Sequence, residues 1–125
     1  IPLLSVVENV EYPLILRGRK SGSRERAEEV LRSVGITETH FTHKPGELSG
    51  GQQQRAAIAR ALVNSPDFLL CDEPTGNLDT KTGTAIMDLL AAENRRGKTV
   101  IMVTHDPDVA AYARRTIRIV DGRIT

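Results

Sequence analysis

The hydrophobic positions in the first third of the chain recur at the three- and four-residue spacing of helices. A helix is predicted over residues 4–17, and Pro13 is expected to bend or restart it because proline has no backbone N–H to donate. A second helix is predicted after Ser23, a suitable N-cap, and should end just before Gly35. Residues 36–48 have no such period and are predicted to be irregular.

The period changes in the second half of the chain. After a third predicted helix at residues 50–63, the short hydrophobic run at 68–71 is typical of a strand buried on both faces of a parallel sheet. A helix over residues 80–95, capped by Asp79, precedes a second buried strand at 99–103. Strand, helix and strand in this order predict a crossover unit of an α/β fold.

The last twenty residues predict one more helix and a hairpin. Asp106 and Pro107 suit the N-cap and first position of a helix that ends near residue 114. A final strand is expected over residues 116–120. Asp121-Gly122 then predicts a tight turn into the last three residues.

Length and composition limit the classes of protein. A chain of 125 residues forms one compact domain or part of one, and 17 basic against 16 acidic residues argue against a nucleic-acid partner. Cys71 is alone and cannot form an intrachain disulfide. No hydrophobic run approaches the roughly 20 residues that cross a bilayer. The one basic cluster is predicted to be a solvated face, because neighbouring glutamates balance its charge. It consists of Arg17, Arg19, Lys20, Arg24 and Arg26.

The strongest chemical signal is Leu48-Ser49-Gly50-Gly51-Gln52, which opens the third helix. Glycine costs a helix about 1 kcal/mol relative to alanine, so a pair in the first turn needs a compensating role. Without side chains the backbone can be approached closely, while Ser49 and the first N–H groups attract an anion such as a phosphate. The alternative is a serine-capped helix with a flexible start.

Two carboxylates follow the first predicted strand. Asp72 and Glu73 lie where open α/β sheets bind ligands, and neighbouring strand residues point to opposite sides. One carboxylate suits Mg²⁺ and the other suits the activation of an attacking water. The alternative is that both cap the following turn.

Histidines offer one further candidate. His105 follows the next strand and is expected at the same sheet edge, beside Asp72 and Glu73, although a single histidine at a strand end is more often structural. His40 and His43 are spaced like a metal-binding pair, but no nearby residue completes a site, so ordinary loop residues are predicted.

Together these motifs resemble the ABC ATPase family over essentially the whole chain. The signature motif at residues 48–52, the Walker B strand ending at Glu73, the loop Gly76-Asn77-Leu78-Asp79 and the switch histidine His105 stand in the family's order. The stretch at residues 8–14 and the one at 74–79 are similar to the lipoprotein-release and macrolide-export branch.

The resemblance implies a role for each matched residue. Contacts to the γ-phosphate of ATP held by the opposite subunit would come from Ser49, Gly50, Gly51 and Gln52. The resemblance assigns Mg²⁺ to Asp72, general-base catalysis to Glu73, communication across the dimer to Asp79 and γ-phosphate sensing to His105. The family acts as a head-to-tail dimer bound to a transmembrane permease, at the cytoplasmic face of the membrane.

The resemblance also implies the fold: an incomplete α/β P-loop NTPase domain with parallel strands, a helical subdomain and a C-terminal β-hairpin. Residues 1–47 would belong to the helical subdomain that touches the permease, and residues 48–125 to the catalytic core. The family's phosphate loop, Gly-x-x-x-x-Gly-Lys-Ser/Thr, has no counterpart here. Gly97-Lys98-Thr99 matches the end of this pattern, but it is expected to leave a helix and enter a strand, whereas a phosphate loop leaves a strand and opens a helix. Gly97 is expected to stop the helix and Lys98 to lie at the surface.

Without that loop, the 125 residues alone are expected to bind ATP poorly and not to hydrolyse it. An unpaired strand edge is also expected, with a tendency to self-associate. The sequence therefore predicts the catalytic half of a transport ATPase. The alternatives are a non-catalytic module that pairs with a permease or an intact ATPase subunit, and a chromosome-maintenance or translation ATPase; a long coiled coil before the signature, typical of chromosome ATPases, is missing.

Overall fold

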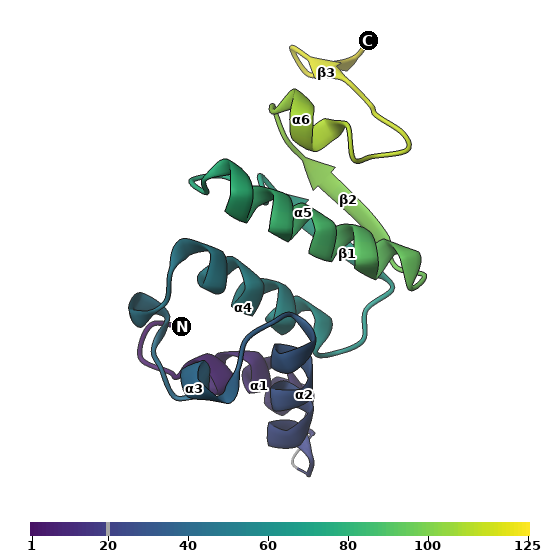
Figure 1. Cartoon of the computed structure of the whole chain (residues 1–125). Helices are drawn as coiled ribbons and strands as arrows, with labels where there is room; N and C mark the ends of the chain where they lie inside the picture. The colour runs from purple at the N-terminus through teal and green to yellow at the C-terminus, as the bar shows by residue number, and fades with distance from the viewer. Residues whose placement is uncertain (20) are drawn as a thin grey trace.

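The computed structural model of the chain describes residues 1–19 and 21–125 (Figure 1). Its first half is helical and contains α1 (Val6–Leu16), α2 (Ser23–Ser33), α3 (Glu38–Phe41), the 3-10 turn η1 (Pro45–Glu47) and α4 (Gly50–Leu62). Its second half contains β1 (Phe68–Asp72), α5 (Thr80–Arg95), β2 (Thr99–Val103), α6 (Pro107–Ala110), β3 (Ile119–Val120) and β4 (Arg123–Ile124). Figure 1 shows the helical half at one end of the molecule and the C-terminal hairpin at the other.

The helical half packs α1 against α2 and α4 around small aliphatic side chains. Val10 and Leu31 at the centre of this packing are completely buried. The prediction that Pro13 could restart the first helix is wrong, since α1 continues through it. Pro13 lies near the end of α1, so its missing N–H removes a single bond, to the Asn9 carbonyl, and the packed face of the helix is unaffected.

The start of α2 also differs from the prediction. Gly22, with a φ of 74°, is the N-cap, and Ser23 is the first helical residue. The buried Ser23 hydroxyl donates to the Glu11 carboxylate of α1 at 2.7 Å, so a contact between helices replaces the expected capping bond. The end of the helix is as predicted, with Gly35 just beyond it at a φ of 87°.

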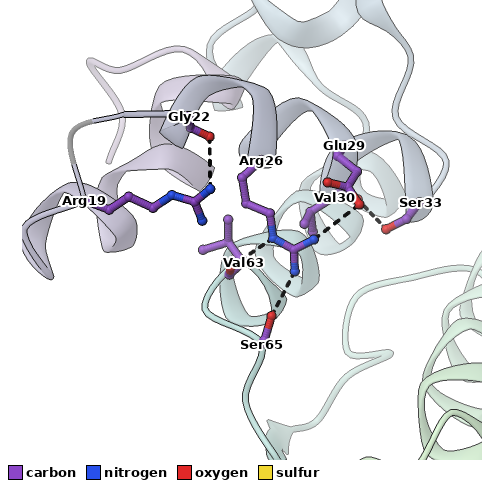
Figure 2. A network of polar contacts seen from close by, with 8 residues as sticks. All are labelled: Arg19, Gly22, Arg26, Glu29, Val30, Ser33, Val63 and Ser65. Carbon is purple, nitrogen blue, oxygen red and sulfur yellow. Dashed lines mark hydrogen bonds and ion pairs between the residues drawn. The ribbon is translucent and has the colours of Figure 1, made fainter.

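Part of the basic cluster ties α2 to the end of α4 (Figure 2). Arg26 donates to the Val63 carbonyl at 3.3 Å and to the Ser65 hydroxyl at 3.1 Å, and pairs with Glu29. Arg24 pairs with Glu11 at 3.2 Å. The described arginines of the cluster therefore have local partners or lie exposed, while Lys20 lies outside the described residues.

The segment predicted to be irregular forms two short helical turns, α3 and η1. Phe41 of α3 is buried, and Gln53 of α4 donates to the Pro45 carbonyl of η1 at 2.8 Å. These contacts stabilise turns that are too short to show a period in the sequence.

The crossover unit is confirmed. The strands β1 and β2 pair in parallel, with Asp72 opposite Val103, and α5 connects them. Asp79 caps α5 by accepting from the Thr82 N–H, and Gly97, with a φ of 102°, follows its end. Lys98, expected at the surface, is half-buried because its ammonium donates to the Pro66 carbonyl at 2.7 Å.

The prediction that both strands are buried on both faces is wrong for the described residues. One face packs toward α4 and α5 through Leu69, Cys71, Val100 and Met102. Every second residue points away from this core and is at least half exposed: Phe68, Leu70, Ile101 and Val103. We call these four residues the bare face. The outer edges of the two strands pair with no other described strand, as expected.

The C-terminal elements are shorter than predicted. Asp106 caps α6 through the Asp108 N–H at 2.8 Å, but the helix ends at Ala110 and β3 has two residues. Residues 111–125 are all exposed, so no core contact extends these elements. The turn is as predicted, since Asp121 and Gly122 both have positive φ, as a tight hairpin requires.

Candidate functional site

The start of α4 is closed by reciprocal hydrogen bonds. Ser49 is the N-cap, and its hydroxyl accepts from the Gln52 N–H at 3.2 Å while the Gln52 side chain accepts from the Ser49 N–H at 3.0 Å. The N–H groups of Gly50 and Gly51 belong to the first turn and have no intrahelical acceptor. Ser49 and Gly50 are exposed, so an anion can reach this end of the helix.

The two glycines also have a reason inside the chain. A Cβ at Gly51 would lie 2.5 Å from the Thr82 Cγ2 of α5, and a Cβ at Gly50 would lie 3.2 Å from the Leu78 Cδ2. Gly51 is buried by this contact. The glycine pair therefore allows α4 to pack closely against the segment that leads into α5, a role that the sequence did not reveal.

Replacing Gly51 with alanine is expected to destabilise the complete protein by about 1 kcal/mol, because overpacking costs roughly 1–3 kcal/mol and the helix preference of alanine returns up to ~1 kcal/mol. Thr82→Ser removes the clashing methyl, so Gly51→Ala/Thr82→Ser should regain the loss. Urea unfolding measures both. Gly46→Ala is the matched control, since nothing lies within 4 Å of a Cβ there. A double variant no more stable than Gly51→Ala would contradict this packing role.

The carboxylates lie at the carboxyl edge of the parallel sheet, as predicted. Asp72 is the last residue of β1 and its side chain is exposed. Glu73 leaves the strand with a φ of 48°, an unusual conformation for a residue with a side chain, and its N–H donates to the Val103 carbonyl at 2.8 Å. The backbone thus bends at Glu73, immediately after the end of the strand.

Glu73 is held by the loop that follows β2. Its carboxylate oxygen Oε1 lies 2.6 Å from His105 Nδ1 and accepts from the His105 N–H at 3.1 Å, while Oε2 accepts from the Thr104 hydroxyl at 3.2 Å. Partial burial raises the pKa of Glu73, but the bonds from His105 and Thr104 outweigh burial and lower this pKa below its ordinary value. The carboxylate is therefore ionised and oriented at neutral pH. The predicted proximity of His105 and Glu73 is confirmed.

The remaining candidates are Asp79 and the histidine pair, His40 and His43. Asp79 faces the start of its own helix, and the hydrogen bond from Thr82 lowers its pKa. His40 and His43 stack edge to face at 5.0 Å, and His40 Nε2 lies 3.4 Å from the Gln52 amide. No group of three potential metal ligands occurs among the described residues.

Sequence reasoning missed Thr104 and Gln54. Thr104 precedes the predicted histidine, so its position at the strand end was a usable signal. The amide of Gln54 in α4 donates to the carbonyl of Pro74, immediately after Glu73, at 2.8 Å. A side chain that reaches a distant backbone carbonyl leaves no sequence pattern.

This arrangement combines two chemical capacities. The exposed start of α4 suits an anion, and the oriented Glu73 carboxylate suits a proton acceptor. Asp72 offers one exposed carboxylate, which fits a cation whose other ligands come from phosphate or water. Within residues 1–19 and 21–125, no helix is both long and apolar enough to span a membrane.

Comparisons with known proteins agree with these features. The family model described as "ABC transporter" matches residues 1–76, more than half of the chain. The uncharacterized ABC transporter ATP-binding protein MJ0796 of Methanocaldococcus jannaschii is 54% identical over 99% of this chain and 55% of its own length. The lipoprotein-releasing system ATP-binding protein LolD of Geobacter metallireducens is 51% identical over 99% of this chain and 56% of its own.

A solved structure is equally similar. It is described as the dimeric structure of a post-hydrolysis state of the ATP-binding cassette MJ0796 bound to ADP and Pi, and it has a TM-score of 0.86 at 50% identity. The match covers 99% of this chain and 56% of that one. The chain thus spans about half the length of the relatives it matches. One of these relatives is an ATP-binding protein of a lipoprotein-releasing system, which agrees with the predicted branch of the family. The chain belongs to the ABC transporter family.

Proposed function

We propose that this chain supplies the signature and carboxylate half of an ATP-hydrolysing subunit, and that the complete protein uses ATP to drive a membrane transporter. The observation that carries the proposal is the Glu73 carboxylate, fixed by His105 and Thr104 at the carboxyl edge of a parallel sheet. A carboxylate held in this way can orient a water and take its proton.

The family resemblance assigns a role to each candidate residue. Ser49, Gly50, Gly51 and Gln52 would face the γ-phosphate of ATP bound to a second subunit. Mg²⁺ would neutralise phosphate charge during transfer, and Asp72 would hold it directly or through water. Glu73 would be the general base. His105 would contact the γ-phosphate, and Asp79 would communicate between the subunits.

The partners follow from the same proposal. A second copy would complete each site in a head-to-tail dimer. Residues 1–47 would form the helical subdomain that contacts a transmembrane permease, and residues 48–125 would belong to the catalytic core. The protein would lie at the inner face of the membrane through this permease.

A complementation experiment tests the composite site. Ser49→Asp keeps a good N-cap but repels phosphate, and Glu73→Gln removes the base, so each variant of the complete protein should be inactive alone. A mixture contains heterodimers with one intact site, so equal amounts should recover about a quarter of the wild-type ATPase rate. An inactive mixture, with dimer exchange verified by mass, would contradict composite sites. A complete wild-type protein without ATPase activity would favour the non-catalytic module.

A further inference from the structure

The segment after Glu73 is attached to α4 at three points. Gly51 packs against Thr82, Gly50 lies beside Leu78, and the Gln54 amide nitrogen Nε2 donates to the Pro74 carbonyl at 2.8 Å. The Gln54 bond is the polar one of the three and the nearest to Glu73 in sequence. It is partly buried, so water competes for it less than for an exposed bond.

The loop needs such support because its backbone is strained. Glu73 has a φ of 48°, and a residue with a side chain keeps this conformation only when its surroundings hold it. The Glu73 N–H donates to the Val103 carbonyl, and the Glu73 carbonyl accepts from the Gly76 N–H at 3.0 Å. Pro74 has no N–H, so its carbonyl is the hydrogen-bonding group that its backbone offers, and Gln54 binds it.

We propose that Gln54 is a positioning residue for Glu73. From its place in α4, Gln54 fixes Glu73 indirectly, by donating a hydrogen bond to the Pro74 carbonyl. This inference rests on the proposed function. The bond fixes the peptide that follows Pro74, and this peptide determines how the loop leaves Glu73. A fixed loop keeps the Glu73 carboxylate directed at His105 and Thr104. In the proposed dimer, α4 would therefore face the nucleotide bound to the second subunit and also orient Glu73, the base that would act on the nucleotide of its own subunit.

The chemistry of the bond defines the diagnostic substitutions. Gln54→Glu preserves the size of the side chain but replaces the donor with an acceptor that repels the carbonyl. Gln54→Lys restores a donor of sufficient length. Gln53→Glu is the matched control, because Gln53 donates to the Pro45 carbonyl at 2.8 Å and the Leu48 carbonyl at 3.3 Å, away from Glu73.

Hydrogen exchange of the complete protein tests the contact without ATP. Gln54→Glu should accelerate exchange at residues 73–78 by roughly 5- to 10-fold, as expected for the loss of one hydrogen bond, and Gln54→Lys should restore protection. Gln53→Glu should act on residues 45–49 instead. Unchanged exchange at 73–78 in Gln54→Glu, or equal acceleration there by Gln53→Glu, would overturn the proposal.

Steady-state kinetics test the consequence for Glu73. Gln54→Glu should lower kcat roughly 10-fold and leave the KM for ATP within about twofold, while Gln54→Lys should recover most of the rate. A raised KM with unchanged kcat would instead mean a binding role and would overturn the positioning role. If the wild-type protein hydrolyses no ATP, the proposed function fails, and hydrogen exchange still decides whether Gln54 holds the loop.

Discussion

Replacing Glu73 with glutamine in the complete protein is expected to lower the rate of ATP hydrolysis by about 10²–10⁴-fold, the contribution typical of a general base. Glutamine keeps the size of the side chain and can still bond to His105 and Thr104, but its amide cannot take a proton from water. Phosphate release at saturating ATP measures the effect.

The matched control is Glu25→Gln, the same chemical change on the exposed face of α2. It should leave the rate unchanged. Binding of ATP, followed by equilibrium titration, should survive in Glu73→Gln because the proposed role of the carboxylate is to act on water and not on the nucleotide. A Glu73→Gln protein that keeps more than about a tenth of the wild-type rate would show that another group takes the proton.

The second large effect is expected on stability. Leu31→Ala should lower the free energy of unfolding of the complete protein by about 2–5 kcal/mol, because it opens a cavity where α1, α2 and α4 meet. Leu31 is fully buried, whereas Leu16 at the end of α1 is 68% exposed. Leu16→Ala is therefore the matched control, with an expected change within about 0.5 kcal/mol.

Urea unfolding followed by circular dichroism measures both variants. Similar losses for Leu31→Ala and Leu16→Ala would mean that the helical half has no defined core. Intact ATPase activity per folded molecule in Leu31→Ala would separate this packing role from the chemistry at Glu73.

The sequence predicted the elements whose signals are local. The start of α4 at Gly50, the parallel strands β1 and β2, and the helix caps Asp79 and Asp106 all depend on neighbouring residues or on a clear period. The contact between Glu73 and His105 also followed, because parallel strands bring their carboxyl ends to one edge.

The features that the sequence did not predict depend on contacts between distant segments. Ser23 bonds to Glu11 instead of capping its own helix, and Gln54 reaches Pro74. The close approach of Gly51 and Thr82 requires the packing of two helices to be known. The bare face was missed for a different reason: an uninterrupted hydrophobic run indicates what a strand needs to bury, but not whether the described residues cover it.

The unusual backbone of Glu73 carries an energetic cost that its side chain offsets. A glycine there would adopt a φ of 48° without the penalty of about 1 kcal/mol or more that a side chain incurs. The same glycine would lose the bonds that the Glu73 carboxylate accepts from the His105 N–H and the Thr104 hydroxyl, each worth about 1 kcal/mol, so the gain in the backbone is offset. The carboxylate thus stabilises a loop whose backbone is strained, and under the proposed function the same group would act on water.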